Sequence, residues 1–190
     1  MSDTARKLLV LDLDETLVHA RETPLQYDED FCVGQYFIYR RPGLDDFIFA
    51  MLDIFDVAVW TSSGENYAAQ VLERIFPRGA LKFVWSSKRC TMLRDWDTGE
   101  MTNIKNLTKL RRRGYALESV IAVDDTPAKY AKSYGNLVTV REFVGDRDDD
   151  ELPLLARYLR SLRHVDNVRD IEKRRWRERL LRESAPPIVK

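Results

Sequence analysis

Three short apolar segments of this 190-residue chain each run into an acidic or hydroxyl side chain, and this feature constrains the fold most. The segments span residues 8–13, 56–61 and 119–123. Apolar runs of this length, rich in β-branched residues, are typical of buried strands in a parallel sheet. Residues 44–55 and 65–76 carry apolar side chains at helical spacing, so strand and helix alternate as in βαβ units. The sequence therefore predicts an α/β fold with a parallel sheet flanked by helices.

Other segments complete the predicted order of elements. Residues 31–40 are rich in aromatic and β-branched side chains and predict a further strand, and residues 81–102 alternate around Asp97-Thr98-Gly99 as a β-hairpin would. Two helices are predicted at 106–113 and 127–132, followed by a last strand at 136–140. Two helical segments follow residue 146, the second over residues 169–182. We expect a catalytic domain at 1–145, with the hairpin as an insertion near its site, and a helical C-terminal extension at 146–190 packed on or beside it.

The composition excludes several classes of protein. The 31 basic residues balance the 31 acidic ones, so no overall field points to nucleic acid or to a membrane surface. The apolar run near the amino terminus is soon interrupted by carboxylates, which fits neither a secretory signal nor a membrane span. The two cysteines share no metal-ligand or disulfide spacing. We expect a protein of a reducing compartment that is not secreted, cytoplasmic or, in a eukaryote, nuclear.

The first strand delivers two carboxylates, Asp12 and Asp14, at its carboxyl end. Open α/β sheets place their ligand crevice at this edge. Two acids so close repel each other unless a cation lies between them, which implies a hard divalent ion. A carboxylate can attack phosphorus to give an acyl-phosphate, while a second acid protonates the leaving alkoxide. We therefore predict that Asp12 is the nucleophile and Asp14 the general acid and base of a phosphate-ester hydrolase.

Polar residues after the other strands can complete such a site. Thr61 and Ser62 follow the second strand and precede a helix whose first amides can bind phosphate, although such a run alone is usually only a helix cap. Lys105 precedes a predicted helix, and alone it carries little information. Asp124 and Asp125 end the third strand before a proline, where they suit a magnesium site better than a simple cap.

The segments DLDETLVH, WTSS, Lys105 and VDDTP occur in the order of the four motifs of the haloacid dehalogenase superfamily, which the chain resembles. The form DLDETLVH, with RPG after a later strand, resembles its FCP/SCP branch, the phosphatases of the RNA polymerase II C-terminal domain. The resemblance implies a Rossmann-like fold, a Mg²⁺ cofactor and a phosphoserine or phosphothreonine protein or peptide as substrate.

The resemblance also implies a role for each site residue. Asp12 becomes nucleophile and metal ligand, and Asp14 acid/base and metal ligand through its backbone carbonyl. Thr61, Ser62 and Lys105 become phosphate-binding residues. Asp125 falls at the metal-ligand position with Asp124 beside it, behind the ligands. Small members of the family have Asp-Asn here, so the extra carboxylate is expected to tighten metal binding.

The resemblance predicts an open site. The chain after residue 143 is too short and too helical for the phosphopeptide-recognition domain of large members, so a bare catalytic domain is expected, with the hairpin in place of a cap. Aromatic and apolar side chains available for a peptide groove are Phe31, Tyr36, Phe37, Trp85 and Met92. Two alternatives stay open: a polynucleotide 3'-phosphatase or small-metabolite phosphatase, with nucleic acid the less favoured partner, and a catalytically inactive peptide-binding module.

Overall fold

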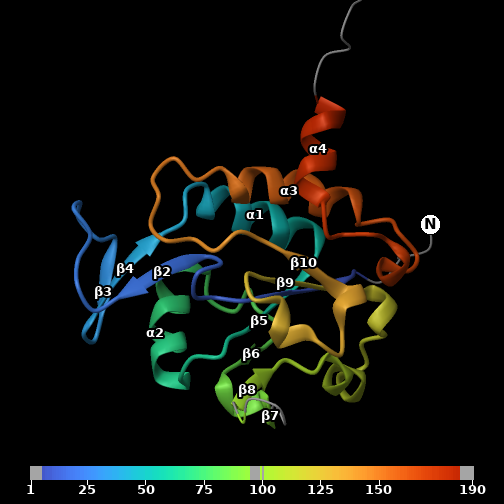
Figure 1. The fold of residues 1–190 in the computed structure, drawn as a ribbon, viewed down its shortest axis with the longest axis horizontal. Helices are drawn as coiled ribbons and strands as arrows, with labels where there is room; N and C mark the ends of the chain where they lie inside the picture. The colour runs from blue at the N-terminus through green and yellow to red at the C-terminus, as the bar shows by residue number, and fades with distance from the viewer. Residues whose placement is uncertain (1–5, 95–98, 100, 185–190) are drawn as a thin grey trace, which may run out of the picture.

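The main sheet carries the fold. The structure, a computed structural model, describes residues 6–94, 99 and 101–184, and within them five parallel strands have the order β10-β9-β1-β5-β6 (Figure 1). The central strand β1 (Leu8–Leu11) pairs with β5 (Asp56–Trp60) on one side and β9 (Val120–Asp124) on the other. The outer strands are β6 (Val84–Trp85) and β10 (Leu137–Thr139). The predicted α/β fold with a parallel sheet is confirmed.

Successive side chains of each strand enter different cores on the two faces of the sheet. Leu9 and Leu11 of β1 join the core covered by α1 (Leu44–Ile54), α2 (Glu65–Ile75) and α3 (Glu151–Ser161), of which α1 and α3 lie side by side in Figure 1. Leu8 and Val10 join the opposite core. That face is covered by 3-10 segments: η2 (Leu107–Arg113), η3 (Leu117–Ser119) and η4 (Pro127–Tyr130). Two of these are the helices predicted at 106–113 and 127–132, which form as 3-10 rather than α-helices.

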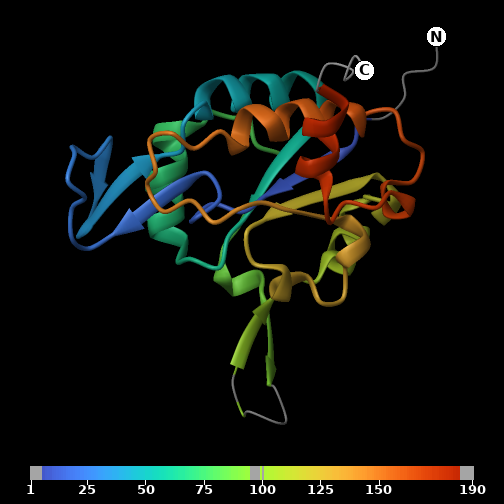
Figure 2. The same ribbon diagram turned by 45° about the horizontal axis from the view of Figure 1, so that its top comes forward.

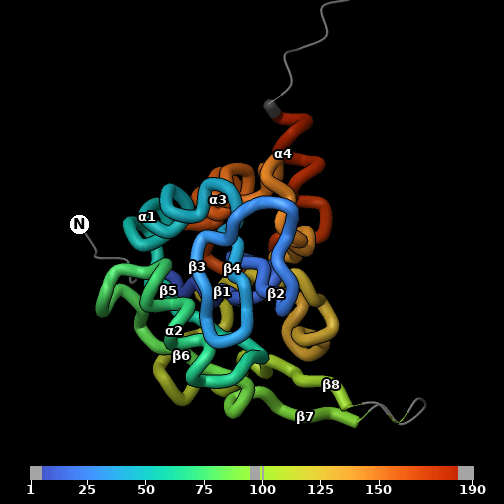
Figure 3. Tube along the Cα trace, turned by 90° about the vertical axis from the view of Figure 1, so that its left-hand side faces the viewer, coloured from blue at the N-terminus to red at the C-terminus, as the bar shows by residue number. Residues whose placement is uncertain are grey.

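A second, antiparallel sheet has the order β2-β4-β3 and lies where the main strands reach their carboxyl ends (Figures 1 and 3). It contains β2 (Val18–Arg21), β3 (Phe31–Val33) and β4 (Tyr36–Arg40). The prediction of one strand over 31–40 was wrong, because Gly34 adopts a left-handed conformation (φ +58°) that turns the chain into a hairpin. The strand β2 was not predicted at all.

The predicted hairpin over 81–102 is wrong in its first half. Only β7 (Thr91–Arg94) and β8 (Met101–Ile104) pair as a hairpin, which projects from the body of the molecule in Figure 2. Val84 and Trp85 instead pair with β5, because Trp85 is buried against Trp60, with ring centroids 4.7 Å apart. The predicted turn residues Asp97 and Thr98 lie outside the described residues. Between β6 and β7 lies η1 (Ser87–Arg89).

The segment after residue 146 is helical in part. The helix α3 forms as predicted, whereas the second segment contains η6 (Val168–Asp170) and becomes α-helical only in α4 (Trp176–Ser184). The reason is local: the Lys173 ammonium is buried and donates to the carbonyl oxygens of Val168 and Ile171, which holds the chain in a loop. The short segment η5 (Tyr134–Asn136) precedes β10. In the ranges that the structure describes, no helix has the length and apolar character needed to span a membrane.

Candidate active site

The predicted site residues converge at the carboxyl edge of the three central strands. Asp12 follows β1, Thr61 follows β5 and Asp124 ends β9. The order β9-β1-β5 places the Asp12 side chain between the other two strand ends. The backbone continues this pairing, since the Asp12 amide donates to Val123 O at 2.9 Å. Parallel strands end at one edge, so residues far apart in sequence meet here.

Asp12 is buried (1% exposed) and both of its carboxylate oxygens are bound. Oδ1 accepts from the Leu13 amide at 2.8 Å and from Lys105 Nζ at 2.8 Å. Oδ2 accepts from Lys129 Nζ at 3.0 Å. Burial acts to raise the pKa of Asp12, but the charges of Lys105 and Lys129 outweigh it and hold the pKa below its usual value. Asp12 is therefore ionised, as a carboxylate nucleophile must be.

Lys105 is fully buried and joins Asp12 to Asp124. Its Nζ lies 2.8 Å from Asp12 Oδ1 and 2.5 Å from Asp124 Oδ2, and 5.9 Å from the centroid of the Tyr130 ring. Lys105 follows β8 directly, so the base of the hairpin positions its side chain at the site. A fixed cation at this point suits the anionic charge of a phosphoryl group.

The acidic pair at the end of β9, Asp124 and Asp125, differs in burial and in hydrogen-bond partners. Asp124 is buried, and its Oδ1 accepts from the Thr126 amide at 2.9 Å. Burial, and then repulsion by Asp12, raise the pKa of Asp124 to about 7, only partly offset by the lysines. Asp125 is partly exposed and accepts from Thr126 Oγ1 at 2.9 Å and Thr16 Oγ1 at 3.4 Å.

Asp12, Asp124 and Asp125 form a cluster that fits a divalent cation. Each offers one oxygen, and these oxygens lie within 4.8 Å of one another. Hard carboxylate oxygens are the ligands that Mg²⁺ prefers. This carboxylate cluster therefore fits magnesium, and it contains two of the three predicted ligands, Asp12 and Asp125. The predicted division between Asp125 as ligand and Asp124 behind it stays a prediction.

Asp14 faces away from this cluster. Its Oδ2 accepts from Ser63 Oγ at 2.6 Å and Thr61 Oγ1 at 3.3 Å, and its Oδ1 accepts from the Tyr67 hydroxyl at 2.6 Å. Beside it lies a cavity of about 290 Å³. Its lining residues are Asp14, Glu15, Ala20, Tyr36, Ser63, Gly64 and Tyr67. A leaving group in this cavity would be within reach of a carboxyl that can give it a proton.

The loop after β5 holds two predicted phosphate-binding hydroxyls. Thr61 Oγ1 accepts from the Ser63 amide at 2.9 Å and donates to Asp14. Ser62 Oγ is buried and has no hydrogen-bond partner among the described residues. An unpaired buried hydroxyl is costly, so a ligand oxygen is a natural partner for it. Ser62 is therefore free to donate to a ligand oxygen, whereas the Thr61 hydroxyl already donates its proton to Asp14, and the phosphate-binding roles of both stay predictions.

The five side chains proposed for a peptide groove are divided by the structure. Tyr36 lines the cavity beside Asp14, and Met92 is 63% exposed on the hairpin. Trp85 is buried in the core that contains Leu8 and Val10, and Phe31 packs on the core that contains Leu9 and Leu11, under the guanidinium of Arg74. Phe37 is partly buried in β4.

Sequence reasoning missed three groups of residues at the site. Ser63 and Tyr67 hold Asp14, and Lys129 binds the acidic cluster. The only available signal for Lys129 was its position four residues after Asp125, in a segment predicted to be helical.

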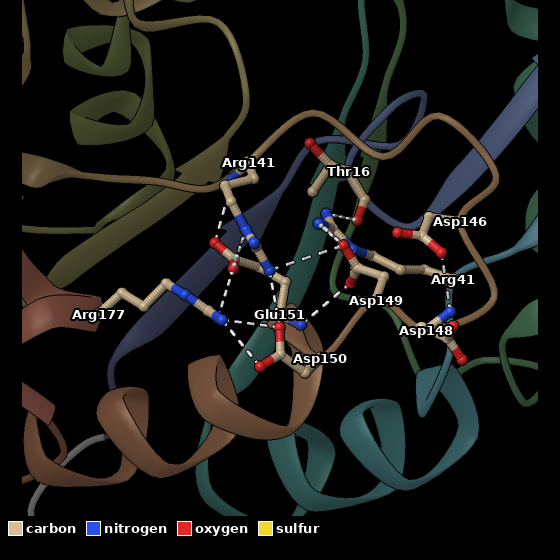
Figure 4. Close-up of polar contacts among 9 residues, drawn as sticks. All are labelled: Thr16, Arg41, Arg141, Asp146, Asp148, Asp149, Asp150, Glu151 and Arg177. Carbon is tan, nitrogen blue, oxygen red and sulfur yellow. Dashed lines mark hydrogen bonds and ion pairs between the residues drawn. The ribbon is translucent and has the colours of Figure 1, made fainter. Parts of the chain in front are cut away.

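The third group is a single residue, Arg41 of the RPG segment, which supports the loop that carries Asp12 and Asp14. Its side chain is buried and forms a bidentate pair with Asp149, at 2.8 and 2.9 Å, while Nη1 donates to Thr16 O at 3.0 Å (Figure 4). Thr16 in turn donates to Asp125. Arg141 and Arg177 extend the same polar cluster over Glu151. A buried ion pair therefore links the C-terminal segment to the loop that carries Asp12 and Asp14.

Comparison with known proteins shows the family of the chain. The model of the NLI interacting factor-like phosphatase family matches residues 7–169. The Dictyostelium discoideum CTD small phosphatase-like protein 2 is 32% identical over 168 residues, which cover 85% of this chain and 28% of the relative. The human CTD small phosphatase-like protein is 30% identical over 173 residues, 87% of this chain and 59% of the relative.

A solved structure shares the fold. A variant of the fission yeast RNA polymerase II CTD phosphatase Fcp1, bound to beryllium fluoride, aligns with a TM-score of 0.55 at 19% identity, over 93% of this chain and 62% of the other. The chain spans less than two thirds of the length of the two curated relatives above. The resemblance predicted from DLDETLVH, WTSS, Lys105 and VDDTP is confirmed: the chain belongs to the NLI interacting factor-like phosphatase family.

Proposed function

We propose that this chain is a magnesium-dependent phosphatase that hydrolyses phosphate monoesters through a covalent aspartyl-phosphate on Asp12. The observation that carries the proposal is the state of Asp12, a buried carboxylate kept ionised by two ammonium groups beside two further carboxylates. Family membership supports it.

The chemistry divides between the two aspartates. A carboxylate oxygen of Asp12 attacks phosphorus, the bond from phosphorus to the leaving oxygen breaks, and the Asp14 carboxyl gives that oxygen its proton. Asp14, now ionised, takes a proton from water, whose oxygen attacks phosphorus and releases phosphate from Asp12. The hydroxyls that hold Asp14 fix the orientation of this proton carrier.

Fixed positive charge and hydroxyl groups hold the phosphoryl oxygens. Lys105, Thr61 and Ser62 are the residues proposed for this task. Magnesium would be held by the carboxylates of Asp12 and Asp125 and the backbone carbonyl of Asp14. When bound, it neutralises charge that develops on the phosphoryl oxygens.

We further propose phosphoserine or phosphothreonine in a protein as the substrate class. Relatives support it by name, among them a human small phosphatase of the RNA polymerase II carboxy-terminal domain. The cavity beside Asp14, lined by Tyr36 and Ala20, offers apolar contact to residues next to the phosphate.

Turnover of an aryl phosphate tests the enzyme class. We expect hydrolysis that requires Mg²⁺ and stops with a chelator, and a loss of at least about 1,000-fold in Asp12→Asn, because an amide is not a nucleophile. Asp12→Asn must unfold as cooperatively as the parent protein for this comparison. Full turnover in a folded Asp12→Asn protein would contradict the mechanism.

A substrate panel tests the substrate class. It contains a phosphoserine peptide, a phosphotyrosine peptide, free phosphoserine, a 3'-phosphorylated oligonucleotide and sugar phosphates. We expect the highest kcat/KM for the phosphoserine peptide, because contacts remote from phosphorus can stabilise the transition state. If the oligonucleotide or a sugar phosphate has the highest kcat/KM, the proposed protein substrate is wrong, but the proposed phosphatase activity is not contradicted.

A further inference from the structure

Lys129 lies among the three carboxylates that could hold a metal ion. Its Nζ is 3.0 Å from Asp12 Oδ2, 3.4 Å from Asp124 Oδ1 and 4.0 Å from Asp125 Oδ1. Asp12, Asp124 and Asp125 are also the members of the acidic cluster described above. A cation that belongs to the chain therefore contacts every member of the candidate metal centre.

The two lysines of the site divide the carboxylate oxygens between them. Lys105 binds Asp12 Oδ1 and Asp124 Oδ2, and Lys129 approaches the other oxygen of each, Asp12 Oδ2 and Asp124 Oδ1. No side-chain oxygen of Asp12 or Asp124 is left without an ammonium neighbour. A divalent cation that uses either carboxylate therefore binds an oxygen that already has an ammonium neighbour, and two cations so close repel each other.

The two lysines differ in access to solvent. The Lys105 side chain is fully buried, whereas that of Lys129 is 20% exposed. The backbone of Lys129 is fixed, since its amide donates to Thr126 O at 3.1 Å and its carbonyl accepts from the Lys105 amide at 2.8 Å. Its long side chain can thus move its ammonium toward water without any change in the backbone. Of the two lysines, Lys129 is the one that can be displaced.

We propose that Lys129 is an internal competitor of the metal ion. Its ammonium group holds Asp12, Asp124 and Asp125 together in the metal-free protein and leaves them when a divalent cation binds. This inference rests on the metal centre of the proposed function. It has two consequences that need no substrate: the metal-free protein is stabilised by Lys129, and its affinity for metal is lowered.

Direct metal titration tests the inference. Calorimetry with Mg²⁺, and in parallel with Mn²⁺, is carried out on metal-free wild type and on Lys129→Met, which keeps an apolar stem but has no charge. We expect the variant to bind Mg²⁺ at least about tenfold more tightly, because the competing charge is gone. Lys132→Met is the matched control, a neighbouring exposed lysine with no ion pair among the described residues, and should bind like wild type.

Thermal unfolding gives a second readout. In a chelator, Lys129→Met should unfold at a lower temperature than wild type, because three clustered carboxylates then have only Lys105. Saturating Mg²⁺ should raise the Tm of the variant by more than that of wild type. Lys129→Arg keeps the charge and should bind Mg²⁺ no more tightly than wild type.

Several results would overturn the inference. Lys129→Met that folds and binds Mg²⁺ equally or more weakly than wild type contradicts it. A Lys129→Met protein that stays unfolded in saturating Mg²⁺ also contradicts the inference, because Lys129 should be dispensable there. A variant that folds only when Mg²⁺ is added supports the inference. If wild type and Lys129→Met both show neither heat nor a Tm shift with either metal, the metal centre of the proposed function is wrong as well.

Discussion

Three hydroxyl groups, from Thr61, Ser63 and Tyr67, fix the carboxylate of Asp14. The hydrogen bonds hold it on the cavity side of the strand end, away from the negative charge of Asp12. A proton carrier must be aligned with the leaving oxygen to be effective. We therefore propose that Tyr67 is a positioning residue for Asp14.

Tyr67→Phe tests the positioning role, because it removes only the hydroxyl that donates to Asp14. We expect kcat to fall about tenfold for an alkyl phosphate such as a phosphoserine peptide, because misaligned acid catalysis loses part of its contribution. The loss should be smaller for p-nitrophenyl phosphate, whose leaving group needs little protonation.

A matched control is Tyr134→Phe, since Tyr134 is 58% exposed and does not contact Asp14. Equal losses on the alkyl and aryl substrates would contradict the positioning role and indicate a general disturbance of the site.

Among the elements, the buried pair of Arg41 with Asp149 joins the loop after β1 to the start of α3. Burial acts to raise the pKa of Asp149, but hydrogen bonds from Arg41 and the Glu151 amide outweigh it and hold the pKa below the usual 3.8. A carboxyl whose pKa is lower in the folded state stabilises the fold above its unfolded pKa. That contribution is lost as the pH falls through the folded value.

Asp149→Asn should therefore lower the free energy of unfolding by about 3 kcal/mol at neutral pH, because it leaves the buried Arg41 without its carboxylate. Urea denaturation between pH 3 and 8 measures the difference from wild type, which should be largest above about pH 5 and shrink below 3.8. Asp148→Asn, an exposed neighbour, is the control and should change little. A difference that does not depend on pH would show that lost packing, not the ion pair, is responsible.

The three central strands that carry the site were predictable because the apolar pattern of a buried strand lies within a few consecutive residues. Apolar runs that end in Asp12, Thr61 and Asp124 specify buried parallel strands, and such strands end at one edge whatever their connections. The antiparallel elements were harder. A single residue, Gly34, turns a predicted strand into a hairpin, and the burial of Trp85 moves a predicted hairpin strand to the main sheet.

Contacts across the fold were not predictable from spacing. Lys129 reaches the aspartates from η4, which packs against β8 and β10, and Tyr67 reaches them from α2, which packs against β3. The long-range pair of Arg41 with Asp149 spans more than half the chain. The helix predicted over 169–182 begins late because Lys173 satisfies loop carbonyls in the interior, a contact that no charge pattern indicates.

For the whole molecule, one core joins the sheet to the C-terminal extension. Leu9 and Leu11 of β1 share it with Leu155 of α3 and Trp176 of α4. Trp176 is 2% exposed, its Nε1 donates to Thr139 O at 2.8 Å, and its ring stacks on Tyr158 with centroids 5.3 Å apart. We propose that the extension folds with the catalytic domain as one cooperative unit.

Trp176→Ala should lower the free energy of unfolding by about 4 kcal/mol, since it leaves a large cavity and an unpaired carbonyl. Tryptophan fluorescence, which includes Trp60 and Trp85 in the opposite core, and far-ultraviolet circular dichroism should report one coincident transition. Leu181→Ala, at a 45% exposed position of α4, is the control. Two separate transitions in the parent protein would show that the extension is an independent unit.

The central claim is that phosphate is transferred to Asp12. Rapid quenching of enzyme, Mg²⁺ and a phosphomonoester into borohydride tests it most directly, because hydride attacks an acyl-phosphate carbonyl, expels phosphate and reduces the side chain to that of homoserine. The account predicts homoserine at residue 12 by peptide mass spectrometry, dependent on substrate and absent from Asp12→Asn. Turnover with no modification at residue 12, or modification at Asp14, Asp124 or Asp125 instead, would contradict it.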